Sequence, residues 1–85
     1  MKEFTRIKDY AKTLKDVSIA SVTDYSFGVY PTQGRSGRNQ KSIIVYNDLN
    51  IRIYDLNNLD EVETIENETV ADLIKNLDIK IKELY

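Results

Sequence analysis

The chain has 85 residues, with a formal net charge of −2 and no histidine, cysteine or tryptophan. At this length one small domain with a thin core is expected. The lack of histidine and cysteine excludes disulfides and most nucleophilic and zinc chemistry. The sequence therefore predicts no enzyme, metal site or cofactor. No apolar run reaches the roughly 18 residues of a membrane span, and the N-terminus lacks the apolar stretch of a signal peptide, which together favour the cytoplasm of a bacterium or of a phage-infected cell.

Helical spacing of apolar residues predicts a first helix that ends near residues 15–16. Its apolar face consists of Phe4, Ile7, Tyr10, Ala11 and Leu14. From Val17 the apolar period changes to two, which predicts one long strand that ends at Pro31. On this strand, alternation places Tyr25 and Phe27 on the core face.

Glycines in the segment Pro31–Gln40 predict a loop, after which the β-branched and aromatic run Ser42–Tyr46 predicts a strand. Asn47–Asn50 has turn composition and Ile51–Tyr54 alternates again, so the two strands are expected to form a hairpin. Residues 55–67 fit either a helical turn or an edge strand, because their apolar residues are three apart while their local composition suits a strand.

The last element is a helix with a capping-box start, in which Thr69 is followed by Asp72. Its apolar stripe consists of Val70, Leu73, Ile74, Leu77, Ile81 and Leu84. The sequence therefore predicts one α+β domain over residues 1–85, of order α-β-β-β-α. It consists of a three-stranded antiparallel sheet, or a four-stranded one, with both helices packed on one face.

Charge is unevenly distributed along the chain. Residues 1–46 carry eight Lys and Arg against four Asp and Glu, whereas residues 47–72 carry a single cation, Arg52, against eight carboxylates. Such segregation offers two candidate binding surfaces of opposite sign, although a solvated surface with uneven charge explains it equally well.

A sheet covered by helices on one side leaves its other face open. Alternation along the predicted hairpin places Tyr46, Arg52 and Tyr54 on that face, together with Ile44 and Tyr30. Tyrosine and arginine are enriched at interface hot spots, and tyrosine rings also stack on nucleic-acid bases. We expect a protein interface here, against the alternative that tyrosine is simply common on exposed strands.

The acidic stretch contributes four further candidate partner-binding residues. They are Asp60, Glu61, Glu63 and Glu66. The stretch lacks the glycine and the spacing of a calcium loop, so a metal site is not predicted. Spaced carboxylates can instead imitate a phosphate backbone and enter the basic channel of a partner, against the alternative of a solvated face.

The loop before the hairpin offers an alternative site of opposite charge. Arg35, Arg38 and Lys41 lie among glycines with no acid nearby, a composition suited to gripping phosphate or a nucleic-acid backbone. A soluble hairpin loop or a contact for an acidic protein explains the same residues. The acidic pI of about 5.0 argues against a reader of duplex DNA.

The sequence thus favours a small, non-catalytic protein-interaction module of the cytoplasm. One specific form is a phage or mobile-element inhibitor that binds a host nucleic-acid-processing protein, because Ile, Lys, Asn and Tyr, the products of AT-rich codons, supply 31 of the 85 residues. The alternative function is a nucleic-acid-binding accessory protein that uses the basic loop. A homodimer through Tyr46 and Tyr54 is a further hypothesis, and no membrane partner is expected.

Overall fold

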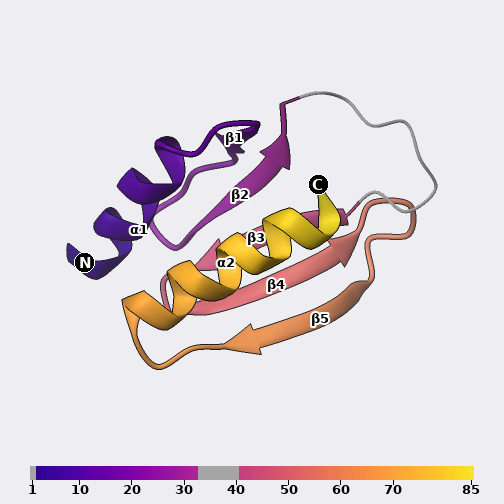
Figure 1. Ribbon diagram of the computed structural model, residues 1–85. Helices are drawn as coiled ribbons and strands as arrows, with labels where there is room; N and C mark the ends of the chain where they lie inside the picture. Colours follow the sequence, from indigo (N-terminus) through magenta and orange to yellow (C-terminus); the bar gives the residue numbers. More distant parts are fainter. Residues whose placement is uncertain (1, 33–40) are drawn as a thin grey trace.

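The computed structural model describes residues 2–32 and 41–85 of the chain (Figure 1). Its elements are α1 (Lys2–Lys12), β1 (Val17–Ala20), β2 (Ser26–Pro31), β3 (Lys41–Tyr46), β4 (Asn50–Asp55), β5 (Glu61–Glu66) and α2 (Val70–Leu84). The strands form one antiparallel sheet in the order β1-β2-β3-β4-β5. The predicted α+β class is confirmed, but the predicted strand count of three or four is wrong, because the described residues already form five strands.

The single long strand predicted from Val17 is instead the hairpin of β1 and β2. The chain reverses because Ser21 adopts a left-handed backbone (φ 55°) and the Thr23 hydroxyl accepts hydrogen bonds from two backbone N–H groups, those of Tyr25 and Ser26, each at 3.0 Å. Tyr25 therefore lies in the turn with 68% of its surface exposed, and its predicted position in the core is wrong.

The remaining strands follow the sequence pattern more closely. β3 and β4 form the predicted hairpin, in which Ile43 lies opposite Ile53 and Ile44 opposite Arg52. Residues 55–67 fitted either a helical turn or an edge strand, and within them residues 61–66 form the edge strand β5. A register shift in the β4–β5 ladder occurs between Ile53 and Tyr54. β5 is the last strand of the sheet, beside β4.

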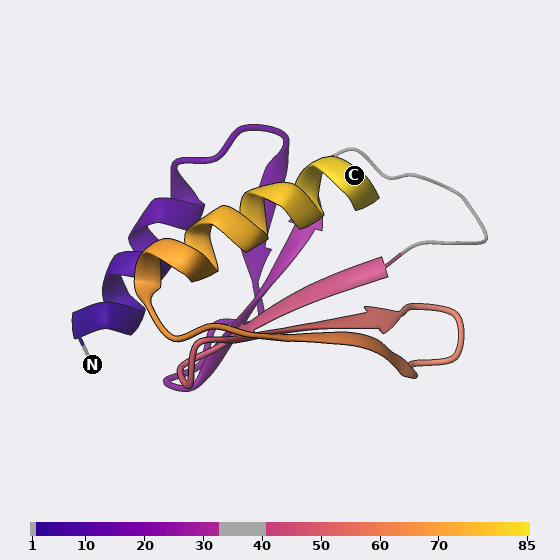
Figure 2. The same ribbon diagram turned by 60° about the horizontal axis from the view of Figure 1, so that its bottom comes forward.

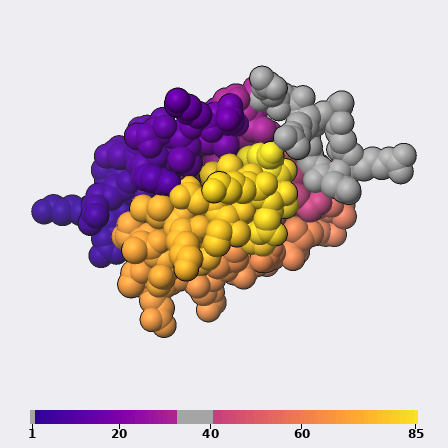
Figure 3. Space-filling view, viewed as in Figure 1, coloured from indigo at the N-terminus to yellow at the C-terminus, as the bar shows by residue number. Residues whose placement is uncertain are grey.

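Both helices pack on the same face of the sheet, which Figure 2 shows edge-on. The core lies between the two layers and combines helix residues with the inward side chains of the strands. Its largest fully buried side chains are Phe27, Ile7, Ile43, Ile51, Ile53, Leu73, Leu77, Val29 and Val45. The space-filling view shows α1 and α2 covering this side of the molecule (Figure 3). Neither helix in the described part of the chain is long and apolar enough to cross a membrane.

The start of α2 supports a first prediction about stability. The hydroxyl of Thr69 accepts a hydrogen bond from the backbone N–H of Asp72 at 3.1 Å and so caps the helix, as the sequence predicts. Replacing Thr69 with alanine should lower the free energy of unfolding by about 1 kcal/mol, because one helical N–H loses its partner. Urea denaturation measures this loss, and Thr69→Asp should avoid most of it. An equal loss in both variants would contradict the capping role.

Candidate functional site

The sheet face away from the helices carries the predicted aromatic residues. Core residues alternate along each strand with side chains on this second face, which carries Tyr30, Ile44, Tyr46, Arg52 and Tyr54. All five are half-buried, although no helix of the described residues covers them. We call this group the open face. Its side chains are partly shielded because they pack on one another.

Arg52 is at the centre of the open face. Its guanidinium carbon lies 4.7 Å from the centroid of the Tyr46 ring, a cation–π contact, and the hydroxyls of Tyr46 and Tyr54 are 3.2 Å apart. The hydrogen bond to Tyr54, followed by burial, raises the pKa of Tyr46 to about 12. The contact with Tyr54 likewise raises the pKa of Arg52. The structure thus brings one cation onto the Tyr46 ring and joins that ring to Tyr54 through their hydroxyls.

One atom of this cluster has no hydrogen-bond partner. The Nε of Arg52 is buried, and no acceptor in the described part of the chain lies within hydrogen-bond distance of it. Its closest carboxylate oxygen, Oε1 of Glu61, is 3.9 Å away, which satisfies an ion pair but is too long for a hydrogen bond. The Arg52 side chain as a whole is 37% exposed, so this donor lies at the surface of the open face and not in the core.

The neighbouring part of the open face is closely packed. The Tyr30 ring lies over Gly28 so tightly that a Cβ added to Gly28 would come within 2.5 Å of a ring carbon. Ser42, opposite Tyr54 in the β3–β4 register, is only 4% exposed although its strand position faces away from the helices. The backbone beneath the tyrosines is therefore shielded, and a partner would meet mainly rings, the arginine and the side chain of Ile44.

The structure separates the four acidic candidates. Glu61 lies beside Arg52, and Glu66 lies opposite Asn50 in the β4–β5 ladder. Glu63 lies opposite Ile53 on the helix side, where its Oε1 is 2.9 Å from the Lys80 ammonium, an interaction that raises the pKa of Lys80. Asp60 precedes the strand and is exposed. Only Glu61 contacts the open face, so the predicted partner-binding set divides between two sides of β5.

The alternative basic site is only partly described. Arg35 and Arg38 lie outside the described residues, so the structure does not place them. The Lys41 ammonium lies 3.8 Å from a carboxylate oxygen of Asp55 on the neighbouring strand. Lys41 therefore takes part in an ion pair within the sheet, and a phosphate would have to compete with Asp55 for its ammonium group.

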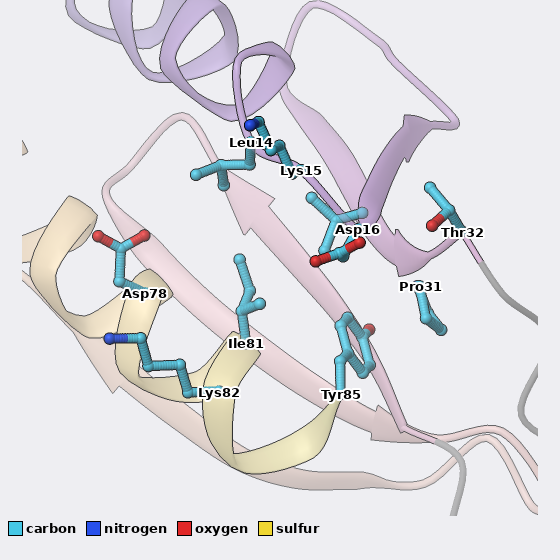
Figure 4. Close-up of a pocket in the computed structure, with 10 residues that line it drawn as sticks. Leu14, Lys15, Asp16, Pro31, Thr32, Asp78, Ile81, Lys82 and Tyr85 are labelled. Carbon is cyan, nitrogen blue, oxygen red and sulfur yellow. The ribbon is translucent and has the colours of Figure 1, made fainter.

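A pocket of about 460 Å³ lies on the other side of the molecule, between the α1–β1 connection and the end of α2 (Figure 4). Leu14, Ile81 and Tyr85 contribute apolar lining. Two of its polar groups are engaged within the fold: Asp78 accepts from the Tyr10 hydroxyl at 2.7 and 2.9 Å, and the Tyr85 hydroxyl donates to the carbonyl of Val29 at 2.6 Å. The polar lining also includes Lys15, Asp16, Thr32 and Lys82.

Sequence reasoning missed this pocket and the exposure of Leu59. The pocket combines residues about 60 positions apart, which no local pattern reveals. Leu59 is 74% exposed, and the only sequence signal is its position between two turn-forming residues. No group of acidic, histidine or cysteine side chains in residues 2–32 and 41–85 could hold a metal ion.

Two tyrosines with raised pKa values support a prediction about alkaline stability. Burial raises the pKa of Tyr85 to about 12, as the contact with Tyr54 does for Tyr46, against 10.0 for an ordinary tyrosine. Both tyrosines therefore lose their protons at a higher pH in the folded state than in the unfolded state. The resulting contribution to the free energy of unfolding is complete below pH 10 and is lost as the pH rises to 12. Urea denaturation across this window should show the free energy of unfolding falling with pH, with a shallower fall in Tyr85→Phe and Tyr46→Phe. An unchanged slope in both variants would contradict this assignment.

Comparison of the chain with models of protein families, with curated proteins and with solved structures finds no match. The function is therefore inferred from the residues and geometry of the open face and of β5.

Proposed function

We propose that this protein is a non-catalytic binding module that recognises a partner protein through the open face. The observation that carries the proposal is the cluster of Tyr46, Arg52 and Tyr54 on a sheet face that neither helix covers. Rigid tyrosine rings bury large areas at a low entropic cost, and a stacked guanidinium adds directional donors.

The carboxylates beside the open face favour a partner whose binding surface is positively charged. Glu61 contacts Arg52, and Glu66 is exposed at the end of β5. A partner with basic groups around an apolar centre complements this arrangement, and its affinity should fall as salt screens the charges. The specific form of the proposal is an inhibitor, from a phage or mobile element, that occupies a basic surface of a nucleic-acid-processing protein.

A capture experiment tests the proposal. Tagged protein is incubated with a low-GC bacterial lysate at low and moderate salt, with and without nuclease, and the retained proteins are identified. We expect one protein to be retained after nuclease treatment. The double variant Tyr46→Ala/Tyr54→Ala should lose it, because hot-spot tyrosines contribute about 2 kcal/mol or more each.

The matched control is Tyr25→Ala, which removes an exposed tyrosine in the β1–β2 turn. It should retain the partner as the unaltered protein does. Equal retention by the double variant and the control would refute the role of the open face. Loss of all retained material with nuclease would instead support nucleic-acid binding through the basic loop.

A further inference from the structure

The pocket beside the C-terminal part of α2 has the size of a small-molecule site. Its volume of about 460 Å³ lies within the roughly 300–1,000 Å³ that is usual for ligand pockets. The α1–β1 connection and the paired ends of β1 and β2 supply the apolar side chains of Leu14, Val17 and Pro31. The last turn of α2 and its cap supply Ile81 and the ring of Tyr85 (Figure 4). A ligand that fills this space therefore needs an apolar body.

The carboxylate of Asp16 lies in this pocket without a partner from the fold. Figure 4 shows it near the middle of the lining residues. Within the described part of the chain, no side chain forms an ion pair or a hydrogen bond with it. Asp16 is also exposed, so a ligand in the pocket can reach its oxygens.

Backbone contacts hold Asp16 at the pocket. Its carbonyl accepts a hydrogen bond from the backbone N–H of Thr32 at 3.2 Å, one position beyond the Val17–Pro31 pair that ends the β1–β2 ladder. Its φ of 67° is left-handed, a conformation that aspartate and asparagine tolerate better than most residues. The position of the carboxylate is therefore set before a ligand binds.

Both helices end at the pocket, and this arrangement favours a positive charge there. α1 ends at Lys12, shortly before Leu14, and α2 ends at Leu84, next to Tyr85 (Figure 1). The C-terminal end of a helix carries a partial negative charge, and its last carbonyls are free to accept hydrogen bonds. An ammonium or guanidinium group in the pocket is therefore stabilised by two helix ends as well as by the carboxylate.

Lys15 and Lys82 line the same pocket and suggest the alternative of an anionic ligand. Figure 4 shows both ammonium groups at the margin of the lining residues, directed away from the carboxylate of Asp16. Lysines are common at the C-terminal ends of helices, where they interact favourably with the helix dipole, and Lys82 lies in the last turn of α2. Their presence is thus explained without a ligand, and the geometry favours a cation.

We infer that this pocket binds a small organic cation, in which an amine or guanidinium group is attached to an apolar body. The cationic group pairs with the carboxylate of Asp16, and the apolar body contacts Ile81 and the ring of Tyr85. The pocket lies on the helix side of the sheet, opposite the open face. The inference therefore goes beyond the proposed function and does not rest on it.

The direct probe is phenethylamine, titrated into isotope-labelled protein and followed by NMR. Phenethyl alcohol and phenylpropionate are its uncharged and anionic counterparts with the same ring. We expect the amine to bind at millimolar concentration or below, with chemical-shift changes concentrated in residues 14–17, 31–32 and 78–85. Each counterpart should bind at least about tenfold more weakly. Tighter binding of phenylpropionate, shift changes elsewhere on the protein, or no binding of the amine would overturn the inference.

Two substitutions localise the charge contact. Asp16→Asn removes the charge but keeps a residue that tolerates the left-handed backbone, so the fold should be retained. Asp24→Asn is its matched control, because Asp24 is exposed in the β1–β2 turn, at the other end of the β1–β2 ladder. The first should weaken phenethylamine binding about tenfold and the second should not. Equal binding by the two variants would contradict the inference.

The inference and the proposed function can fail separately. Tyr46→Ala/Tyr54→Ala should bind phenethylamine as the unaltered protein does, because both tyrosines lie on the other face of the sheet. Loss of amine binding in this variant, with an unchanged circular dichroism spectrum, would contradict a separate pocket. Unchanged capture of the partner protein by the same variant would refute the role of the open face and leave the pocket as the binding site of the protein.

Discussion

Replacing Phe27 with alanine is expected to lower the free energy of unfolding by about 3–5 kcal/mol, a large share of the roughly 5–15 kcal/mol that holds a domain folded. Phe27 is fully buried, and its ring centroid lies 5.7 Å from that of Phe4 on α1. The substitution therefore removes core volume from the sheet and the ring contact between Phe27 and Phe4 of α1. Urea denaturation followed by circular dichroism gives the loss directly.

Tyr25→Ala is the matched control, because Tyr25 lies two residues earlier and exposes 68% of its surface. Its cost should stay within about 0.5 kcal/mol, as for other surface substitutions. Similar losses in the two variants would mean that Tyr25 belongs to the core after all. The pair therefore tests the β1–β2 turn, which is where the sequence pattern and the structure disagree.

The β1–β2 turn could not be predicted from the sequence pattern, for a physical reason. It contains no glycine or proline, and it is formed by a left-handed Ser21 and by hydrogen bonds to the Thr23 side chain. Residues on both sides of it have an apolar period of two, so the alternation continues through it as though the strand were unbroken. By contrast, the β3–β4 hairpin and the capped helix α2 follow from local patterns, because their turns and caps use the expected residue types.

The fate of residues 55–67 could not be decided from local pattern, because β5 does not alternate cleanly. Ile65 packs against the core as an inward residue should, but the inward position of Glu63 is occupied by a carboxylate. Lys80 of α2, a residue far along the chain, supplies the charge that makes this position acceptable. A tertiary ion pair therefore replaces the apolar residue on which sequence patterns depend.

The residues of the open face could be predicted because the strands β3 and β4 that carry them could be predicted. Strand alternation alone assigns Tyr46, Arg52 and Tyr54 to one face, and the structure places them there. The acidic residues were treated as one surface, yet the register shift in the β4–β5 ladder places Glu61 and Glu63 on opposite sides of the sheet. Sequence order alone does not indicate this division, because two residues spaced by two are expected on the same side of a regular strand.

Arg52→Met is expected to separate stability from binding. The variant loses the cation–π contact with Tyr46, but it also removes an Nε that has no acceptor, and the side chain is partly exposed, so the free energy of unfolding should change little. Binding of the captured partner should weaken by about 30-fold, as expected for a hot-spot arginine. Isothermal titration calorimetry and urea denaturation of the same variant give the two numbers.

Arg6→Met on α1 is the control for the loss of one positive charge, since Arg6 is exposed on a helix and lies away from the open face. It should leave both quantities unchanged. Arg52→Lys should restore little of the affinity, because an ammonium has neither the planar stacking surface nor the forked donors of a guanidinium. Full recovery by lysine would show that only the charge matters. In that case the unsatisfied Nε would have no role in binding, and the open face would act through its electrostatic field.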